Sequence, residues 1–153
     1  MKKKIMIDLD IVTVAEWDKK EEAIVFLNRI KSEEFLLSTP FIILDLVSNW
    51  KHKSLKSKII NFYEFYSNEV ITVKSYVEKI QEIKLDDKKL SNELLSHNIK
   101  EEDIVLVIIT SIFKLDYLVT FNRKHLKNKE KEINEVLKKH GLKPINITLP
   151  NEL

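Results

Sequence analysis

Two aspartates near the start of the chain have a spacing that would let them hold one metal ion. Asp8 and Asp10 flank Leu9 directly after the apolar run at residues 5–7. Side chains two positions apart on a strand point to the same side, so both carboxylates could face one cation. Taken alone, the pair is explained better by an ordinary strand-to-helix turn in which Asp10 is the helix N-cap.

Two further aspartates lie in apolar surroundings. Asp45 is the only polar residue of the segment 41–47, so a helix there would be apolar nearly all round. A carboxylate in such a helix is costly unless it is paired or bound to a cation. Asp103 follows two glutamates and precedes the apolar run at residues 104–109. Its other interpretation is a favourable charge at a helix N-terminus.

The composition excludes several other kinds of binding and catalytic site. The single glycine excludes the glycine-rich loops that bind phosphates, and the absence of cysteine excludes disulfides, thiolate zinc sites and a cysteine nucleophile. The four histidines are too far apart for the paired spacing of zinc proteases. Lys and Arg exceed Asp and Glu by only 26 to 24, so the net charge of +2 is far from that of a strongly basic binder.

Short apolar runs alternate with longer charged stretches, which is typical of an α/β domain with a mostly parallel sheet. Strands are predicted at residues 5–7, 35–37, 70–73, 117–121 and 145–148. Helices are predicted at residues 18–31, with Asp18 as a cap, and at 38–50, 54–67, 101–115 and 123–140, with two more between 75 and 97. The 153 residues fit a single domain over residues 1–153.

Polar residues follow the strand predicted at residues 117–121. Thr120, Asn122 and Arg123 lie at its C-terminal end, where open α/β sheets bind their ligands. Ordinary turns use the same residue types. Position and residue type together make these three residues candidates for contact with a ligand.

Positive charge is concentrated in two segments. Residues 51–58 contain four lysines and no acid, giving +4, and residues 123–143 contain eight Lys or Arg and three Glu, giving 8 − 3 = +5. A solvated helix surface explains such segments, and so does a surface that binds the phosphates of a nucleic acid. On the second interpretation Lys51, Lys53 and Lys124 join Arg123 as contacts.

The aromatic residues have helical spacing. They comprise Trp17, Trp50 and a group in the helix predicted at residues 54–67, namely Phe62, Tyr63, Phe65 and Tyr66. Side chains at this spacing belong more often to a core or a homodimer interface than to a base-stacking surface. If the group is exposed, we expect a homodimer.

The order of these acids along the chain resembles that of the PIN-domain family. The segment DIVLVIITSIFKLDYLVTFNRKHL, which begins at Asp103, is similar to the end of that family's active-site pattern: an acid opening a helix, a strand, Thr-x-Asp/Asn and a basic helix. The starting IDLD and the final INITLPNEL also fit. This resemblance implies a three-layer α/β/α sandwich with a mostly parallel sheet and clustered carboxylates that hold Mg²⁺ or Mn²⁺.

The resemblance extends residue by residue. Asp8 and Asp103 match the first and third acids of the pattern, and Asp45 matches the second, where Glu is usual. Asn122 stands where many members have a fourth acid, and Asp10 stands where Asn is usual and could restore that charge. Thr120 and Arg123 match flanking polar positions. The implied catalytic set is therefore Asp8, Asp45, Asp103 and Asn122, with the three acids as metal ligands.

The function implied is a metal-dependent nuclease, a ribonuclease that uses in-line attack of metal-activated water on a phosphodiester. Many family members are toxins, so an antitoxin protein is the implied partner besides RNA. No apolar run approaches the roughly 20 residues of a membrane span. No signal peptide is recognisable either, and a cytoplasmic location is therefore expected.

Two other functions fit part of the sequence. Asp8-Leu9-Asp10-Ile11-Val12 also suits the opening of haloacid-dehalogenase-like phosphatases, in which Asp8 would be the nucleophile and Asp10 an acid or base. That family expects an acidic metal motif after a late strand, where this chain has Thr120-Phe121-Asn122. The other alternative is a PIN-like module that has lost its metal through the changes at Asp45 and Asn122 and binds RNA or protein without catalysis.

Overall fold

The computed structural model describes all 153 residues and contains one five-stranded sheet. Its strands are β1 (Lys4–Ile7), β2 (Leu36–Pro40), β3 (Glu69–Ile71), β4 (Tyr117–Val119) and β5 (Ile147–Thr148). They lie in the order β3-β2-β1-β4-β5, and every neighbouring pair is parallel. The prediction of a mostly parallel sheet is confirmed, and β1 is its central strand.

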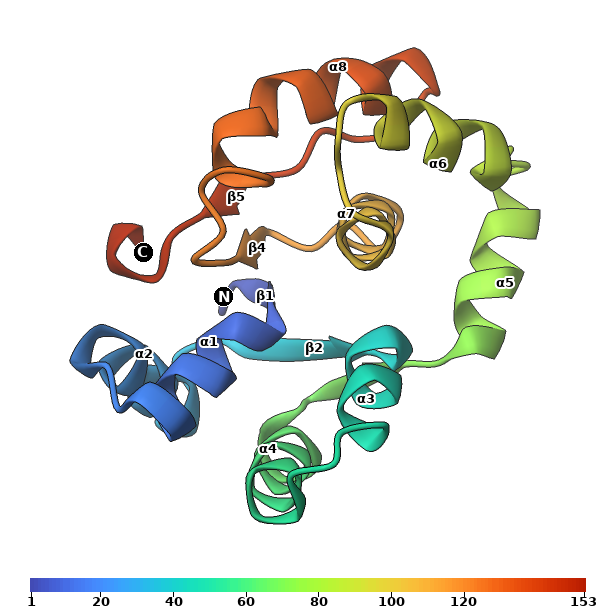
Figure 1. Cartoon of the computed structure of the whole chain (residues 1–153). Coiled ribbons are helices and arrows are strands. Elements are labelled where there is room, and N and C mark those ends of the chain that lie inside the picture. Colours follow the sequence, from blue (N-terminus) through green and yellow to red (C-terminus); the bar gives the residue numbers. More distant parts are fainter.

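Eight α-helices connect and cover the strands. They are α1 (Leu9–Thr13), α2 (Glu21–Lys31), α3 (Phe41–Ser48), α4 (Lys53–Tyr66), α5 (Val73–Glu82), α6 (Asp87–Ser96), α7 (Glu101–Ile112) and α8 (Glu130–Lys139). Helices α1 to α4 are grouped on the side of β1 and β2, helices α7 and α8 lie next to β4 and β5, and α6 packs against α7 and α8 (Figure 1). The apolar run at residues 104–109 belongs to α7, which is buried along almost its whole length.

The segment after β1 differs from the prediction. Residues 9–18 form α1 and a π-helical turn, η1 (Val14–Asp18), so Asp18 ends a helix instead of capping one. Lys19 has a left-handed backbone, φ 55°, which breaks the helix before α2 begins at Glu21. The prediction of a helix from residue 18 came from the helical spacing of the apolar residues that follow and from Asp18 as a cap, and no glycine or proline marks the break in the sequence.

The segment after β4 also differs. The helix predicted from residue 123 begins only at Glu130, after a short 3-10 helix, η2 (Lys127–Lys129). The Oδ1 atom of Asn122 accepts a hydrogen bond from the His125 backbone N–H at 2.9 Å, which closes a turn where the helix was expected. The α8 helix ends as predicted before Gly141, whose φ of +73° suits glycine.

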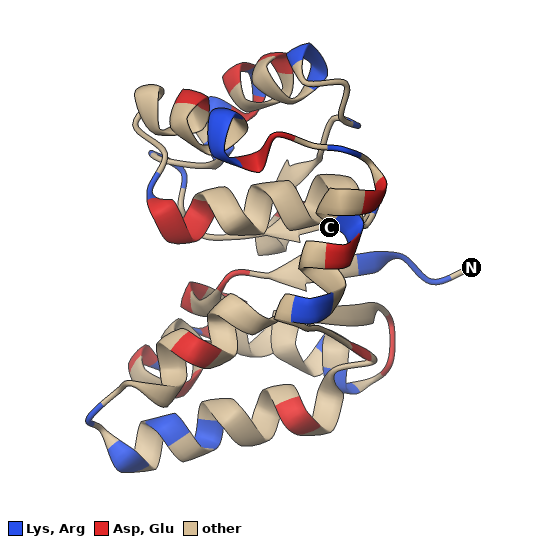
Figure 2. Ribbon diagram, turned by 90° about the vertical axis from the view of Figure 1, so that its right-hand side faces the viewer, with Lys and Arg blue, Asp and Glu red and all other residues tan.

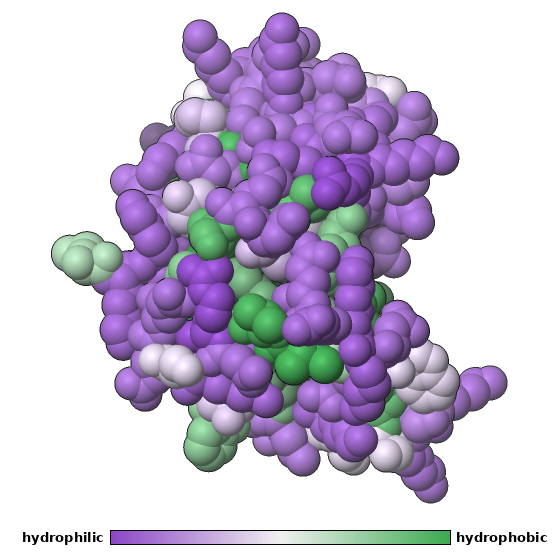
Figure 3. Space-filling model, turned by 90° about the vertical axis from the view of Figure 1, so that its left-hand side faces the viewer, coloured by the Kyte–Doolittle hydropathy of each residue, from purple (hydrophilic) through white to green (hydrophobic).

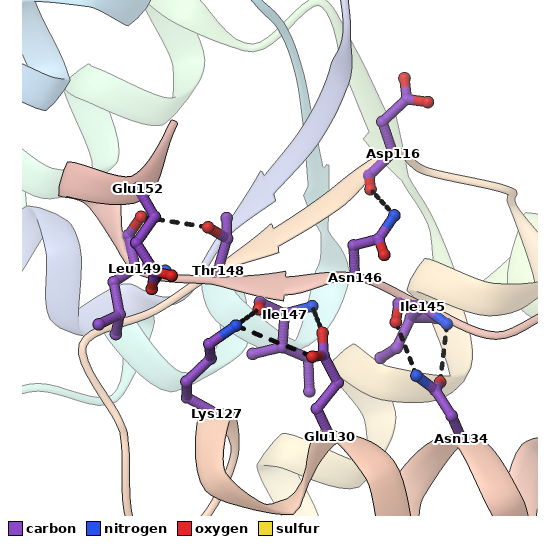
Figure 4. Close-up of polar contacts among 10 residues, drawn as sticks. All are labelled: Asp116, Lys127, Glu130, Asn134, Ile145, Asn146, Ile147, Thr148, Leu149 and Glu152. Carbon is purple, nitrogen blue, oxygen red and sulfur yellow. Dashed lines mark hydrogen bonds and ion pairs between the residues drawn. The ribbon is translucent and has the colours of Figure 1, made fainter.

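The outer edge of β5 is covered by side chains from η2 and α8 (Figure 4). Asn134 exchanges two hydrogen bonds with the Ile145 backbone, at 2.9 and 2.8 Å. Lys127 Nζ donates to the Ile147 carbonyl at 2.7 Å, and Glu130 accepts from the Ile147 backbone N–H. An edge strand with its polar groups occupied is a poor template for pairing with another chain.

The surface is mostly hydrophilic. On the face that carries α2 and the C-terminal turn, apolar atoms show mainly as a small group near the middle (Figure 3). No helix of the structure has both the length and the apolar character that crossing a membrane requires.

Candidate functional site

The C-terminal end of β1 lies at the topological switch point of the sheet, because β2 and β3 are added on one side of β1 and β4 and β5 on the other. The strand β1 pairs with β2 on one side and with β4 on the other, and ligands of open parallel sheets bind at such a point. Asp8 follows β1, its backbone N–H donates to the Val119 carbonyl at 2.8 Å, and it is the N-cap residue of α1. Asp10 lies in the first turn of α1.

The carboxylates of Asp8 and Asp10 lie near each other, as predicted, but not because both residues belong to one strand. Because Asp10 is helical, the first turn of α1 turns its side chain toward the residues that follow β4. There the Thr120 hydroxyl lies 2.9 Å from Asp8 Oδ2 and 3.3 Å from Asp10 Oδ2. The Phe121 backbone N–H also donates to Asp10 Oδ2, at 3.1 Å.

Thr120 connects the carboxylates of Asp8 and Asp10 from a buried position. Its side chain is 0% exposed, and its Oγ1 also accepts a hydrogen bond from the Asn122 backbone N–H at 2.9 Å. The predicted contact between Thr120 and nucleic acid is therefore wrong, because the hydroxyl is inaccessible and already bonded within the protein. Its observed role is to position the carboxylates of Asp8 and Asp10.

Burial makes the three acids of this region difficult to ionise. It is the main cause that raises the pKa values of Asp8, Asp10 and Asp103, the last two to about 7. The charge of Asp8 raises the other two pKa values further, so the three carboxylates lie close enough to repel one another. None takes part in an ion pair with Lys, Arg or His. We call these three residues the acid cluster.

The acid cluster fits a divalent cation that keeps most of its water. Asp10 Oδ1 is buried and accepts no hydrogen bond from the protein. This carboxylate oxygen, an atom that Mg²⁺ binds readily, therefore has no partner within the protein. No three acidic or histidine side chains lie close enough to one another to coordinate a single ion. Mg²⁺ suits such a site, because it is usually held by one or two carboxylates and completes its shell with water.

Asp45 does not join the acid cluster. It lies in α3 as predicted, but its side chain is exposed and only its backbone carbonyl is engaged, by Ser48 Oγ and Asn49 Nδ2. Asp45 is therefore not buried, and the prediction that it needs a cation to offset burial is wrong. The apolar neighbours of Asp45 occupy the faces of α3 that pack on the protein, and Asp45 occupies the remaining one.

The other predicted residues make no side-chain hydrogen bond to the acid cluster. Asn122 uses its side-chain oxygen to close the turn after β4. Arg123, Lys124, Lys51 and Lys53 are exposed, and lysines gather at the N-terminal end of α4 (Figure 2). Their contact with a nucleic acid stays a prediction.

Two residues near the acid cluster were missed. Lys20 Nζ lies over the Phe121 ring, 4.6 Å from its centroid. Tyr63 is 1% exposed and its hydroxyl has no hydrogen-bond partner; burial, with the charges of Asp8 and Asp10, raises its pKa well above the usual range. Nothing in their sequence surroundings separates them from ordinary surface and core residues.

Comparison with solved structures reveals a similar fold. A chain of VapBC2 from Rickettsia felis, in the crystal structure of that complex bound to a DNA fragment from their promoter, matches with a TM-score of 0.63 over 95% of this chain and 98% of that chain. The two sequences are 15% identical. No family model matches the sequence, and no curated protein matches it. The likeness is one of structure, and it establishes that this chain has the PIN-like α/β fold that its sequence predicts.

Proposed function

We propose that the chain is a metal-dependent nuclease that hydrolyses phosphodiester bonds in RNA. One observation carries the proposal: Asp8, Asp10 and Asp103 are brought together at the switch point of the sheet without a cationic partner. Buried carboxylates of this kind are costly unless a cation joins them. The PIN-like fold supports nuclease chemistry over the other uses of a carboxylate-bound cation.

The residues of the chain would divide the work as follows. Asp8 and Asp103 would hold the cation, and Thr120 would fix the Asp8 carboxylate by its hydrogen bond. Asp10 Oδ1, which accepts no hydrogen bond within the protein, would orient the attacking water. A bound Mg²⁺ or Mn²⁺ would supply charge neutralisation at the phosphate and a more acidic water. Arg123 and Lys124 would bind the flanking phosphates.

Asp45 receives a smaller role than its match to the family pattern implies. Its exposed carboxylate could reach the cation through water, but its charge does not raise the pKa of any acid in the cluster. We therefore expect Asp45→Asn to reduce cleavage less than Asp8→Asn does. Equal loss in the two variants would return Asp45 to the ligand set.

A toxin function in a toxin–antitoxin pair, which the resemblance to the PIN-domain family implies, forms part of the proposal. Growth arrest on expression, relieved by Asp8→Asn, would support it. Harmless expression of an active enzyme would contradict it. An antitoxin would then be the protein partner.

The direct test is cleavage of labelled single-stranded RNA and DNA in Mn²⁺, Mg²⁺ or EDTA. The Asp8→Asn and Asp103→Asn variants should lose activity, and Glu78→Gln on the exposed surface of α5 is the matched control. Cleavage that needs neither metal nor these acids would refute the proposal. RNA binding in EDTA without cleavage in any metal would favour the non-catalytic binding module, and hydrolysis of p-nitrophenyl phosphate alone would favour the phosphatase.

A further inference from the structure

Three buried side-chain polar atoms of the chain have no hydrogen-bond partner, namely Asp10 Oδ1, Tyr63 Oη and His125 Nδ1. Buried polar groups are nearly always paired in folded proteins, so each exception needs an explanation, such as a bound ion or water or a role in catalysis. The first two atoms have a property in common, because a carboxylate oxygen and a phenol oxygen both have lone pairs that accept hydrogen bonds. One water molecule has two hydrogens and can satisfy both atoms.

Contacts at the end of α4 place Tyr63 at the edge of the sheet that carries Asp8. The Ser67 backbone N–H donates to the Tyr63 carbonyl at 3.0 Å, and the Ser67 hydroxyl lies 2.6 Å from Thr39 Oγ1. Thr39 is near the C-terminal end of β2, and the register of β1 with β2 puts it beside Ile7, the residue before Asp8. The last turn of α4 is therefore fixed next to the end of β1.

The hydroxyl of Tyr63 faces the acid cluster and remains protonated at neutral pH. The side chain is 1% exposed. Burial is the main cause that raises the pKa of this hydroxyl well above its usual range, and the charges of Asp8 and Asp10 raise it further. The hydroxyl is therefore near both carboxylates, and it adds no negative charge of its own to them.

Both unpaired oxygens are held in fixed positions. The Tyr63 ring packs edge to face on Phe62 within the hydrophobic core, with 5.5 Å between ring centroids, and close packing leaves a core side chain little freedom to turn. The Asp10 carboxylate is fixed through its other oxygen, Oδ2, which accepts from the Thr120 hydroxyl and the Phe121 backbone N–H. The Tyr63 hydroxyl and Asp10 Oδ1 nevertheless form no bond with each other, so a third group is needed to connect them.

We propose that Tyr63 is a positioning residue of the candidate site, and that its hydroxyl and Asp10 Oδ1 together hold one water molecule in the shell of a bound divalent cation. This deepens the proposed function and rests on it for the presence of the cation. A cation-bound water offers its two hydrogens, which match the two fixed acceptors. Partners that orient a metal's ligands from outside the ligand set contribute strongly to metal affinity. Because the Tyr63 hydroxyl has no partner in the metal-free chain, its bond stabilises the loaded state alone.

Binding of Mn²⁺ can be measured without cleavage, from the electron paramagnetic resonance signal of the free ion. Tyr63→Phe should bind Mn²⁺ roughly 10- to 100-fold more weakly than the wild type, the range for losing such an outer partner. Tyr66→Phe is the matched control, because it removes a hydroxyl from a half-buried tyrosine of the same helix, and it should bind Mn²⁺ like the wild type. Unfolding in EDTA should show Tyr63→Phe to be at least as stable as the wild type, which separates weaker metal binding from a damaged fold.

A double-substitution cycle tests whether the two oxygens hold the same water. Asp10→Asn keeps an oxygen for the Phe121 N–H and puts an amide NH₂ in place of Oδ1, so the shared water loses one acceptor. In that background, Tyr63→Phe should weaken Mn²⁺ binding much less than it does in the wild type.

The positioning role is overturned if Tyr63→Phe binds Mn²⁺ as tightly as the wild type, if the two losses of affinity multiply in the double variant, or if Tyr63→Phe is the less stable protein in EDTA. Metal-dependent cleavage by the wild type, together with full Mn²⁺ affinity in Tyr63→Phe, would refute this role and leave the nuclease standing. A wild type that neither binds Mn²⁺ nor cleaves RNA would refute both.

Discussion

Asp103→Asn is expected to stabilise the metal-free protein above neutral pH. Asp103 is 8% exposed, in the first turn of α7, with no hydrogen bond or ion pair to its carboxylate. Burial, together with the negative charges of Asp8 and Glu102, raises its pKa from 3.8 to about 7. At 1.36 kcal/mol per pKa unit the ionised form costs at most about 4 kcal/mol, and less where solvent screens the carboxylate. Asparagine removes the charge but buries an unpaired amide, so we expect a net gain of about 1–3 kcal/mol.

The sign of the pH dependence follows from the same shift. Between about pH 4 and pH 7 the folded chain binds more protons at Asp10 and Asp103 than the unfolded chain does. The free energy of unfolding of the wild type should therefore fall as the pH rises through this window and level off above it. The pKa of Asp8 is also raised, so Asp103→Asn should flatten this fall by removing one of the three groups.

The assay is urea or thermal unfolding in EDTA at pH 5 and pH 8. The gain at pH 8 should raise the melting temperature by about 2–12 °C for a chain of this length. Asp45→Asn, which alters an exposed acid, is the control and should leave stability unchanged. A less stable Asp103→Asn at pH 8, or a wild type equally stable at both pH values, would refute the reasoning. Mn²⁺ should then stabilise the wild type more than the variant.

Three other substitutions test separate parts of the structure by the same unfolding assay. Thr120→Val should destabilise the protein by about 2–3 kcal/mol, because the Asn122 N–H and two carboxylates lose their partner; a loss below about 0.5 kcal/mol would mean that Thr120 holds nothing. Tyr63→Phe should be neutral or stabilising by up to about 1 kcal/mol, since the hydroxyl it removes is buried without a partner, and a clear loss would reveal an unseen bond. Lys114→Gly should stabilise by about 0.5–1 kcal/mol, because Lys114 ends α7 with φ 54°; Lys143→Gly should not stabilise.

The fold was predictable where periodicity and local signals agree. The five strands and most helices followed from apolar runs, and the parallel sheet followed from their alternation. The ends of the helices were harder to predict from the sequence. This chain ends helices with residues in the left-handed conformation, such as Lys19, Lys84 and Lys114, where glycine is usual. A lysine in the sequence gives no sign that its backbone will turn.

Of the predicted catalytic set, Asp8 and Asp103 lie in the acid cluster, whereas Asp45 does not, and Asp10 joins the cluster although the set left it out. Asp8, Asp10 and Asp103 stand out because carboxylates beside apolar runs are unusual. Asp45 shows the same local pattern, and only the tertiary structure reveals that its side of α3 faces solvent. The role of Thr120 depends on the pairing of β1 with β4, which brings together residues 112 positions apart. A local sequence pattern cannot reveal a contact between residues so far apart in the chain.

The same long separation sets when the acid cluster can exist during synthesis of the chain. Asp8 leaves the ribosome early, but β1 remains without β4 as its neighbour until residues 117–119 have followed. Contacts between such distant segments form late, because the intervening chain must first be ordered. For most of its synthesis the nascent chain therefore contains Asp8 without an assembled acid cluster. A product truncated before β4 would lack the site altogether.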